Sequence, residues 1–368
     1  MNSTARTAIV AVAGSVIASA AAVAAARHRA LRAAKPGQPL HPDAPAAPVP
    51  PVLPPGQVMN LPGRGEVFVR DSGGGTIPAA RPAVLLLHGW TVSADINFFP
   101  AYASLAESYR VIALDLRGHG RGLVSTEPFS LEDCADDAAA LLEQLGVDHV
   151  IVVGYSMGGA VGLLLARRHP GKVTALVMQA TALEWRNTAR ERAVWRGLPV
   201  LDLGLRLGVG AGFVERVLRE ATSVDPELGS YRPWLAAEFQ RATSRDLVAA
   251  GRALSRYDAR PWAGQLDIPA AVLVTSRDRL VRSAKQRELA DVLRAYVFVV
   301  DGDHDLPLAK GGEYARVTRL AVDKVAAASG LAHPGRAGQR DKGKHMTGPA
   351  VVTETGSVRN EVRTARDD

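Results

Sequence analysis

Residues 150–159 read VIVVGYSMGG, and this stretch decides the fold. Its four leading aliphatic residues are typical of a buried strand, and a helical pattern follows from residue 157. Ser156 is therefore expected on a sharp turn between strand and helix, where flanking glycines relieve crowding of the backbone. Such a turn lifts the hydroxyl clear of the sheet and aims the first N–H groups of the helix at negative charge beside it. The pattern predicts that Ser156 is a nucleophile, although the same five letters also occur in turns without a chemical role.

Outward from this stretch, short apolar runs alternate with longer helical patterns. The predicted strands are 66–70, 83–87, 110–115, 150–153, 173–178, 270–275 and 296–301, and the predicted helices are 131–145, 157–168, 283–294 and 313–329. The alternation indicates an α/β domain over 63–330. Because the runs are almost continuously apolar, we expect a mostly parallel central sheet with helices on both faces.

About 90 residues separate the predicted strands at 173–178 and 270–275, which is too long for a simple loop. This segment is rich in arginine and tryptophan and looks helical. We expect a helical cap over about 184–262, forming a lid or an acyl pocket, which implies an apolar substrate.

The two ends of the chain differ in composition from the domain. Residues 8–26 carry no charge and are about long enough to cross a bilayer, although most are alanine. We expect 1–26 to be an anchor that associates the protein with a membrane; a cleaved export signal is the alternative. Residues 27–62 are expected to be a proline-rich linker, and 331–368 a disordered tail.

Charge and cysteine content exclude two classes of protein. The net charge is +7, but 63–330 holds 32 basic and 31 acidic residues, so the excess lies in the ends. Because the domain has no long basic run, we expect no nucleic-acid partner. A single cysteine, Cys134, excludes a disulfide framework and a cysteine-rich zinc site.

A serine hydroxyl needs a base to take its proton, and the base needs a third group to orient it. His304 is the one histidine of nine that lies between the last predicted strand and the last predicted helix. Asp278 leaves the strand 270–275, and the order Ser156, Asp278, His304 suits this architecture. The alternative for Asp278 is a capping or ion-paired role. Asp303 and Asp305 adjoin His304, but neighbours on a turn rarely reach the same imidazole nitrogen.

An oxyanion formed at Ser156 needs two hydrogen-bond donors. We expect the N–H of Met157 and the N–H of Trp90, which lies in the turn after strand 83–87. The Trp90 indole, Tyr155 and Trp185 are expected to line the substrate pocket. His88 is expected to brace its loop by a hydrogen bond.

Taken together, the motifs resemble the α/β-hydrolase superfamily in its lipase/esterase-like serine hydrolase branch. They are HGW at 88–90, DLRGHGRG at 115–122, GYSMGG at 154–159, and the loops of Asp278 and His304. Asp303 and the region of Thr275 depart from the pattern, where relatives usually have glycine. The resemblance implies a hydrolase that cleaves carboxylic esters of apolar acyl substrates through an acyl-enzyme.

The resemblance leaves other functions open. The same fold supports cleavage of thioesters, amides and carbon–carbon bonds, perhydrolase chemistry, and binding proteins without catalysis. Serine at the turn argues against haloalkane dehalogenases and epoxide hydrolases, which use aspartate there. Nothing in the sequence indicates a metal site, a nucleotide loop or a redox cofactor, so we expect no cofactor and a small-molecule ester as the ligand.

Overall fold

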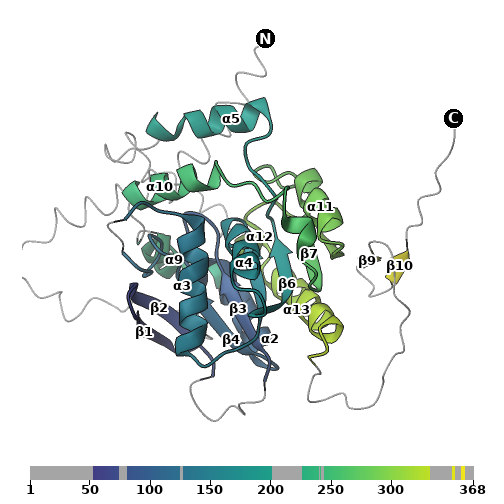
Figure 1. Cartoon of the computed structure of the whole chain (residues 1–368), viewed down its shortest axis with the longest axis horizontal. Helices are drawn as coiled ribbons and strands as arrows, with labels where there is room; N and C mark the ends of the chain where they lie inside the picture. Colours follow the sequence, from purple (N-terminus) through teal and green to yellow (C-terminus); the bar gives the residue numbers. More distant parts are fainter. Residues whose placement is uncertain are drawn as a thin grey trace, which may run out of the picture.

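A computed structural model describes residues 53–73, 81–124, 127–200, 226–239, 241, 244–331, 350–352 and 358–360 (Figure 1). Its strands are β1 (Gly56–Leu61), β2 (Gly65–Asp71), β3 (Ala83–Leu87), β4 (Arg110–Leu114), β5 (Val150–Tyr155), β6 (Val173–Gln179), β7 (Ala270–Thr275), β8 (Tyr296–Val300), β9 (Ala350–Val352) and β10 (Val358–Asn360). They form one sheet in the order β1-β2-β4-β3-β5-β6-β7-β8-β9-β10. The pairs from β4 to β9 are parallel, and the outer pairs are antiparallel. The mostly parallel sheet predicted from the sequence is confirmed.

Helices cover both faces of this sheet. The main ones are α2 (Ala94–Ala106), α3 (Leu131–Gln144), α4 (Met157–Arg168), α11 (Ser283–Val292) and α13 (Gly311–Ala328), with a short α12 (Leu306–Ala309) before the last. Helices α3, α4 and α11 pack on one face, and α2 and α13 on the other. Strand β3 shows why: Leu85 and Leu87 point to the first face, whereas Val84 and Leu86 point to the second, and all are fully buried. Both faces of the central strands are therefore hydrophobic core.

The register of the central strands places the site. Leu87 at the end of β3 lies opposite Gly154 near the end of β5. Because the two strands are parallel, the turns that follow them emerge side by side at the same edge of the sheet. The turns after β7 and β8 emerge at this edge as well, since Thr275 pairs with Val300.

Among the described residues, four α-helices lie between β6 and β7, and we call residues 184–262 the cap segment. They are α5 (Ala189–Arg196), α8 (Pro226–Ser230), α9 (Arg232–Phe239) and α10 (Ser244–Leu254). Helices α5 and α10 lie at the top of Figure 1, beyond the ends of the central strands. The Trp90 indole N–H donates to the Leu247 carbonyl at 2.9 Å, which ties α10 to the turn after β3.

The sequence missed three features of the fold. Strand β1 lies within the stretch 27–62 that was predicted to be linker, and β9 and β10 lie within the predicted disordered tail 331–368. Helix α2 was not predicted, and it carries Pro100 inside it. Proline normally disfavours a helix interior, but Ser93 caps this helix by accepting from the Ile96 N–H.

The expected membrane-associated location is corrected. Residues 8–26, on which it rested, lie outside the described residues. Among the helices that the structure does describe, none combines the length and apolar composition needed to cross a bilayer. A largely alanine segment is also a weak membrane span, because alanine gains little on insertion.

Candidate active site

Ser156 lies on the turn between β5 and α4. Its backbone has φ 53° and ψ −116°, a conformation that costs of order 1–3 kcal/mol for a residue other than glycine. Glycine is required on both sides: a Cβ at Gly154 would lie 2.5 Å from the Gly158 carbonyl oxygen, and one at Gly158 would lie 1.9 Å from the Leu87 carbonyl oxygen. The strained turn is therefore held in place by close packing of α4 against β3 and β5.

Three side chains predicted from distant parts of the sequence meet at this turn. The Nε2 atom of His304 lies 3.1 Å from the Oγ of Ser156, and its Nδ1 lies 2.9 Å from Oδ2 of Asp278. Asp278 is fully buried at its side chain, and His304 is one-fifth exposed. Asp303 instead accepts hydrogen bonds from the N–H groups of His304 and Arg279. The carboxylate on the imidazole is thus that of Asp278.

Asp278 is held by donors on both of its oxygens. Oδ1 accepts from the N–H groups of Leu280 and Val281, at 2.9 and 2.8 Å. Oδ2 accepts from the Thr275 hydroxyl at 2.8 Å and the Gln286 amide at 3.2 Å, besides its contact with His304. The departure from glycine near Thr275 therefore supplies a hydrogen bond to the carboxylate. Gln286 was missed, because a glutamine in a helix gives no sign of pointing inward.

The imidazole of His304 is tuned by opposing effects. Burial disfavours its charged form, but the charge and hydrogen bond of Asp278 outweigh burial, and the pKa of His304 is raised above its ordinary value. Tyr155 also holds His304 in place: its hydroxyl donates to the His304 carbonyl at 2.8 Å, and its ring packs against the imidazole. The orientation of His304 is therefore fixed by Asp278 at its ring and by the Tyr155 hydroxyl at its backbone carbonyl.

Two residues that were predicted to line the substrate pocket are buried. Tyr155 is the last residue of β5 and is buried in the core, where its ring packs against Tyr314. Trp185 is also buried, packs against Tyr257, and accepts a hydrogen bond on its carbonyl from the Trp195 indole. The structure thus places both in packed interior, and their role in lining the substrate pocket stays a prediction.

The turn after β3 lies directly against Ser156. A Cβ at Gly89 would lie 3.3 Å from that of Ser156, so a larger residue there would crowd the two turns. His88 braces the turn as expected: its Nδ1–H donates to the Gly89 carbonyl at 2.8 Å, and its Nε2 accepts from the Leu116 N–H at 2.9 Å. Burial lowers the pKa of His88 to about 4, so the ring is neutral at pH 7.

The two backbone N–H groups predicted to bind an oxyanion belong to Met157, next to Ser156, and to Trp90, next to Gly89. Met157 is the first residue of α4, so its N–H has no acceptor within the helix. The Trp90 N–H donates to none of the described residues. Both groups therefore lack a backbone acceptor among the described residues, and the positive end of the helix dipole adds to the field at Ser156.

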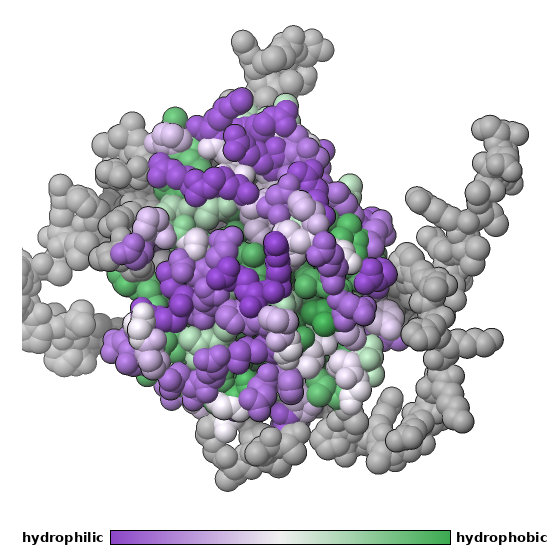
Figure 2. Space-filling view, viewed as in Figure 1, coloured by the Kyte–Doolittle hydropathy of each residue, from purple (hydrophilic) through white to green (hydrophobic). Residues whose placement is uncertain are grey.

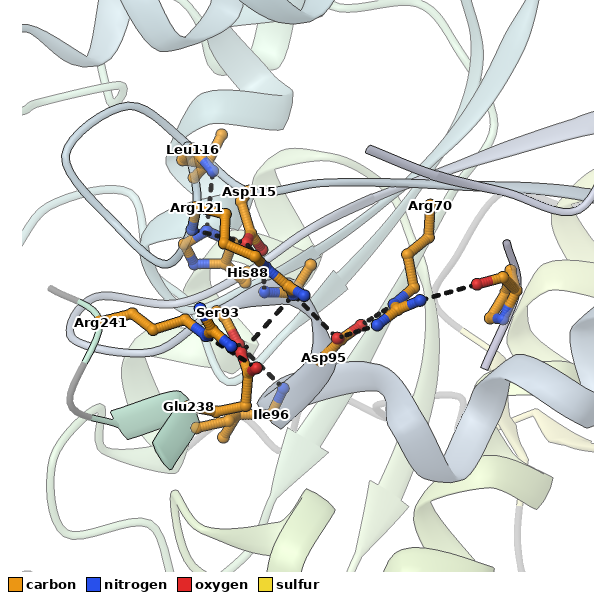
Figure 3. Close-up of polar contacts among 12 residues, drawn as sticks. Arg70, His88, Ser93, Asp95, Ile96, Asp115, Leu116, Arg121, Glu238 and Arg241 are labelled. Atoms are coloured by element: carbon orange, nitrogen blue, oxygen red, sulfur yellow. Dashed lines mark hydrogen bonds and ion pairs between the residues drawn. The ribbon is translucent and has the colours of Figure 1, made fainter. Parts of the chain in front are cut away.

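A buried polar network fixes the base of this turn (Figure 3). Ser93 donates to Oε2 of Glu238 on α9 at 2.9 Å, and Arg121 lies 3.5 Å from the same carboxylate. Arg121 also pairs with Asp95 at 2.8 Å and with Asp115 at 3.1 Å. The network joins the cap segment, the start of α2 and the loop after β4. None of these long-range pairs is visible in the sequence.

Comparison with known proteins places the chain. Residues 82–196 match the model of the alpha/beta hydrolase fold. A pimeloyl-[acyl-carrier protein] methyl ester esterase from Neisseria meningitidis is 30% identical over 213 residues, which cover 56% of this chain and 78% of that protein. The chain belongs to the alpha/beta hydrolase family.

Other members of the family agree with this assignment. A bifunctional esterase/perhydrolase from Acinetobacter calcoaceticus is 33% identical over 118 residues, covering 32% of this chain and 41% of that one. Among solved structures, the enol-lactonase from Burkholderia xenovorans superposes on this hydrolase with a TM-score of 0.62 at 22% identity, covering 73% of this chain and all of that one. The last likeness concerns the fold alone.

Proposed function

We propose that this α/β hydrolase cleaves carboxylic esters through an acyl-enzyme formed on Ser156. The proposal rests above all on one observation, the unbroken line of contacts from the Ser156 hydroxyl through His304 to Asp278. In this line the imidazole accepts from the hydroxyl at Nε2 while Asp278 holds the proton on Nδ1. Relatives that are named as esterases support the choice of ester over other acyl compounds.

The reaction follows from these positions. The Oγ of Ser156 attacks the ester carbonyl carbon while its proton passes to Nε2 of His304, and the carbonyl π electrons move onto oxygen. The N–H groups of Met157 and Trp90 bind that oxyanion. The intermediate collapses to the acyl-enzyme, and the alcohol leaves with the proton from His304. Water then repeats the sequence on the acyl-enzyme, releasing the acid and restoring Ser156.

The imidazolium formed in each step is stabilised by Asp278. Its carboxylate accepts from four groups besides His304. These donors keep the carboxylate fixed and charged, so little reorganisation is needed when His304 takes up the proton. The cap segment is proposed to act as the lid that shields these steps from bulk water.

Hydrolysis of p-nitrophenyl acyl esters tests the proposal. Ser156→Ala is expected to fold normally and to lose turnover, since it removes only the nucleophile oxygen. A fluorophosphonate probe should label the natural protein and not this variant. Turnover retained in Ser156→Ala would remove the mechanism, and absence of labelling in the natural protein would favour a binding role without catalysis.

Perhydrolysis is a second candidate, favoured by the relative named as a bifunctional esterase/perhydrolase. In this reaction hydrogen peroxide replaces water in attacking the acyl-enzyme, and a peracid leaves in place of the acid. Adding peroxide to an assay with an acetate ester and measuring peracetic acid decides between the two.

A further inference from the structure

The cap segment carries a cavity of about 260 Å³ toward which five arginines converge. Those lining it are Arg186, Arg192, Arg196, Arg252 and Arg256. They come from α5, from α10 and from the residues beside these helices. In Figure 2 the surface over α5, at the top of the view, is strongly hydrophilic.

The acidic residues nearest in the chain are engaged elsewhere. Glu184 and Glu191 both bind Lys285, at 2.6 and 2.7 Å, and Asp258 binds Arg260 at 2.6 Å. No acidic residue is among the described residues that line the cavity. Because like charges four residues apart on a helix repel, such a cluster costs free energy until an anion enters it.

One wall of the cavity is apolar and lies against the Trp90 indole. It is formed by Trp195 and Leu198, and the Trp195 ring lies 5.8 Å from that of Trp90. Gly251, next to the cavity, lets these groups meet: a Cβ there would lie 2.8 Å from the Trp90 ring and 3.1 Å from Leu198. The apolar wall of the cavity is therefore in contact with the side chain of Trp90, the residue that carries the proposed oxyanion donor.

We propose that this cavity binds the anionic end, a carboxylate or a phosphate, of the ester substrate. The inference rests on the proposed function, and it adds a charged end to the apolar acyl group expected from the sequence. Guanidinium groups bind both anions through paired hydrogen bonds. A concave site with arginines on one side and an aromatic wall on the other suits an anion on an aliphatic chain better than it suits a flat macromolecular surface.

A matched pair of esters tests the proposal: monomethyl suberate, which carries a free carboxylate, and methyl octanoate, which has the same acyl length without it. For the double variant Arg252→Gln, Arg256→Gln, the KM for monomethyl suberate should rise roughly tenfold or more, since two charged contacts are lost. The KM for methyl octanoate should not change. The control double variant Arg287→Gln, Arg316→Gln, at exposed positions on α11 and α13, should leave both values unchanged. An equal change for both esters, or no change for either, overturns the proposal.

Binding without turnover separates this inference from the proposed function. Calorimetry with suberate and the full-length Ser156→Ala protein should give a Kd that the two cavity substitutions raise by the same factor. A Kd for suberate that the two substitutions leave unchanged would overturn the anion site, whether or not Ser156 proves to be the nucleophile. Comparing inorganic phosphate with acetate as competitors then shows which anion the arginines prefer, and failure of both to displace suberate also counts against the site.

Discussion

The substitution Asp278→Asn is predicted to lower kcat/KM by changing which nitrogen of His304 carries the proton. Oδ1 of Asp278 accepts from two backbone N–H groups, which cannot rotate away. The new amide must therefore place its oxygen there and its NH₂ group at the Oδ2 position, 2.9 Å from Nδ1 of His304. The amide donates to Nδ1, so the proton of the neutral ring moves to Nε2. Nε2 can then no longer accept the proton of Ser156.

The size of the loss follows from the two interactions removed. The ring takes the wrong tautomer, and the imidazolium loses its carboxylate partner. Changes of this kind cost about ten-thousand-fold in rate. That factor corresponds to about 5 kcal/mol of transition-state free energy. Urea denaturation should show the fold intact, because the amide fills the same volume.

The pH profile of kcat/KM gives a second readout. His304 must be neutral to act as base, so the rate rises with pH through its pKa, which in the natural protein is raised above 6.5. Without the Asp278 charge the burial effect dominates, and the acid limb should move to lower pH. Asp303→Asn is the control: Asp303 binds the backbone N–H of His304 but not its imidazole, and the expected loss is within roughly tenfold. Asp278→Asn with more than a tenth of the natural activity, or with an unmoved acid limb, would refute this reasoning.

Three further predictions concern the fold around the site. Gly158→Ala should prevent folding into a soluble form, since its Cβ would overlap the carbonyl at the end of β3; soluble, active protein would contradict the packing. Glu238→Gln should lower the free energy of unfolding by about 1–2 kcal/mol, because it weakens the buried hydrogen bond from Ser93. The loss stays in this range because water can still solvate Arg241, the partly exposed partner of Glu238. An unchanged midpoint of urea denaturation would contradict this prediction. Burial lowers the pKa of His88 and of His119 to about 4, so the unfolded chain binds more protons between pH 6.5 and 4. The free energy of unfolding should therefore decrease as the pH is lowered through this range, by up to about 3 kcal/mol per histidine. A urea midpoint that does not change between pH 7 and pH 5 would contradict this prediction.

The sequence predicted the centre of the fold well because its signals there are local. A strand, a glycine-flanked serine and a helix follow one another over ten residues, and the elements around them alternate with clear periods. Asp278 and His304 could be selected because each follows a predicted strand. The structure places His304 against Ser156 and Asp278 against His304.

Features that depend on distant contacts were missed or misjudged. Strand β1 is preceded by prolines, and only its pairing with β2 makes it a strand. Tyr155 is next to Ser156 in the chain, yet strand alternation turns its ring into the core, where Tyr314 packs against it. Two partners of Glu238, Ser93 and Arg121, lie more than 100 residues away, so no local pattern could reveal them.

The central claim is that the hydroxyl of Ser156 takes up the acyl group of an ester. Intact-mass measurement during rapid mixing with a p-nitrophenyl ester, followed by peptide mapping, tests it directly. We predict a burst of p-nitrophenol of one equivalent and an acyl adduct on the peptide that contains Ser156, absent from Ser156→Ala. Turnover with no adduct at Ser156, or an adduct on another residue, would contradict the account.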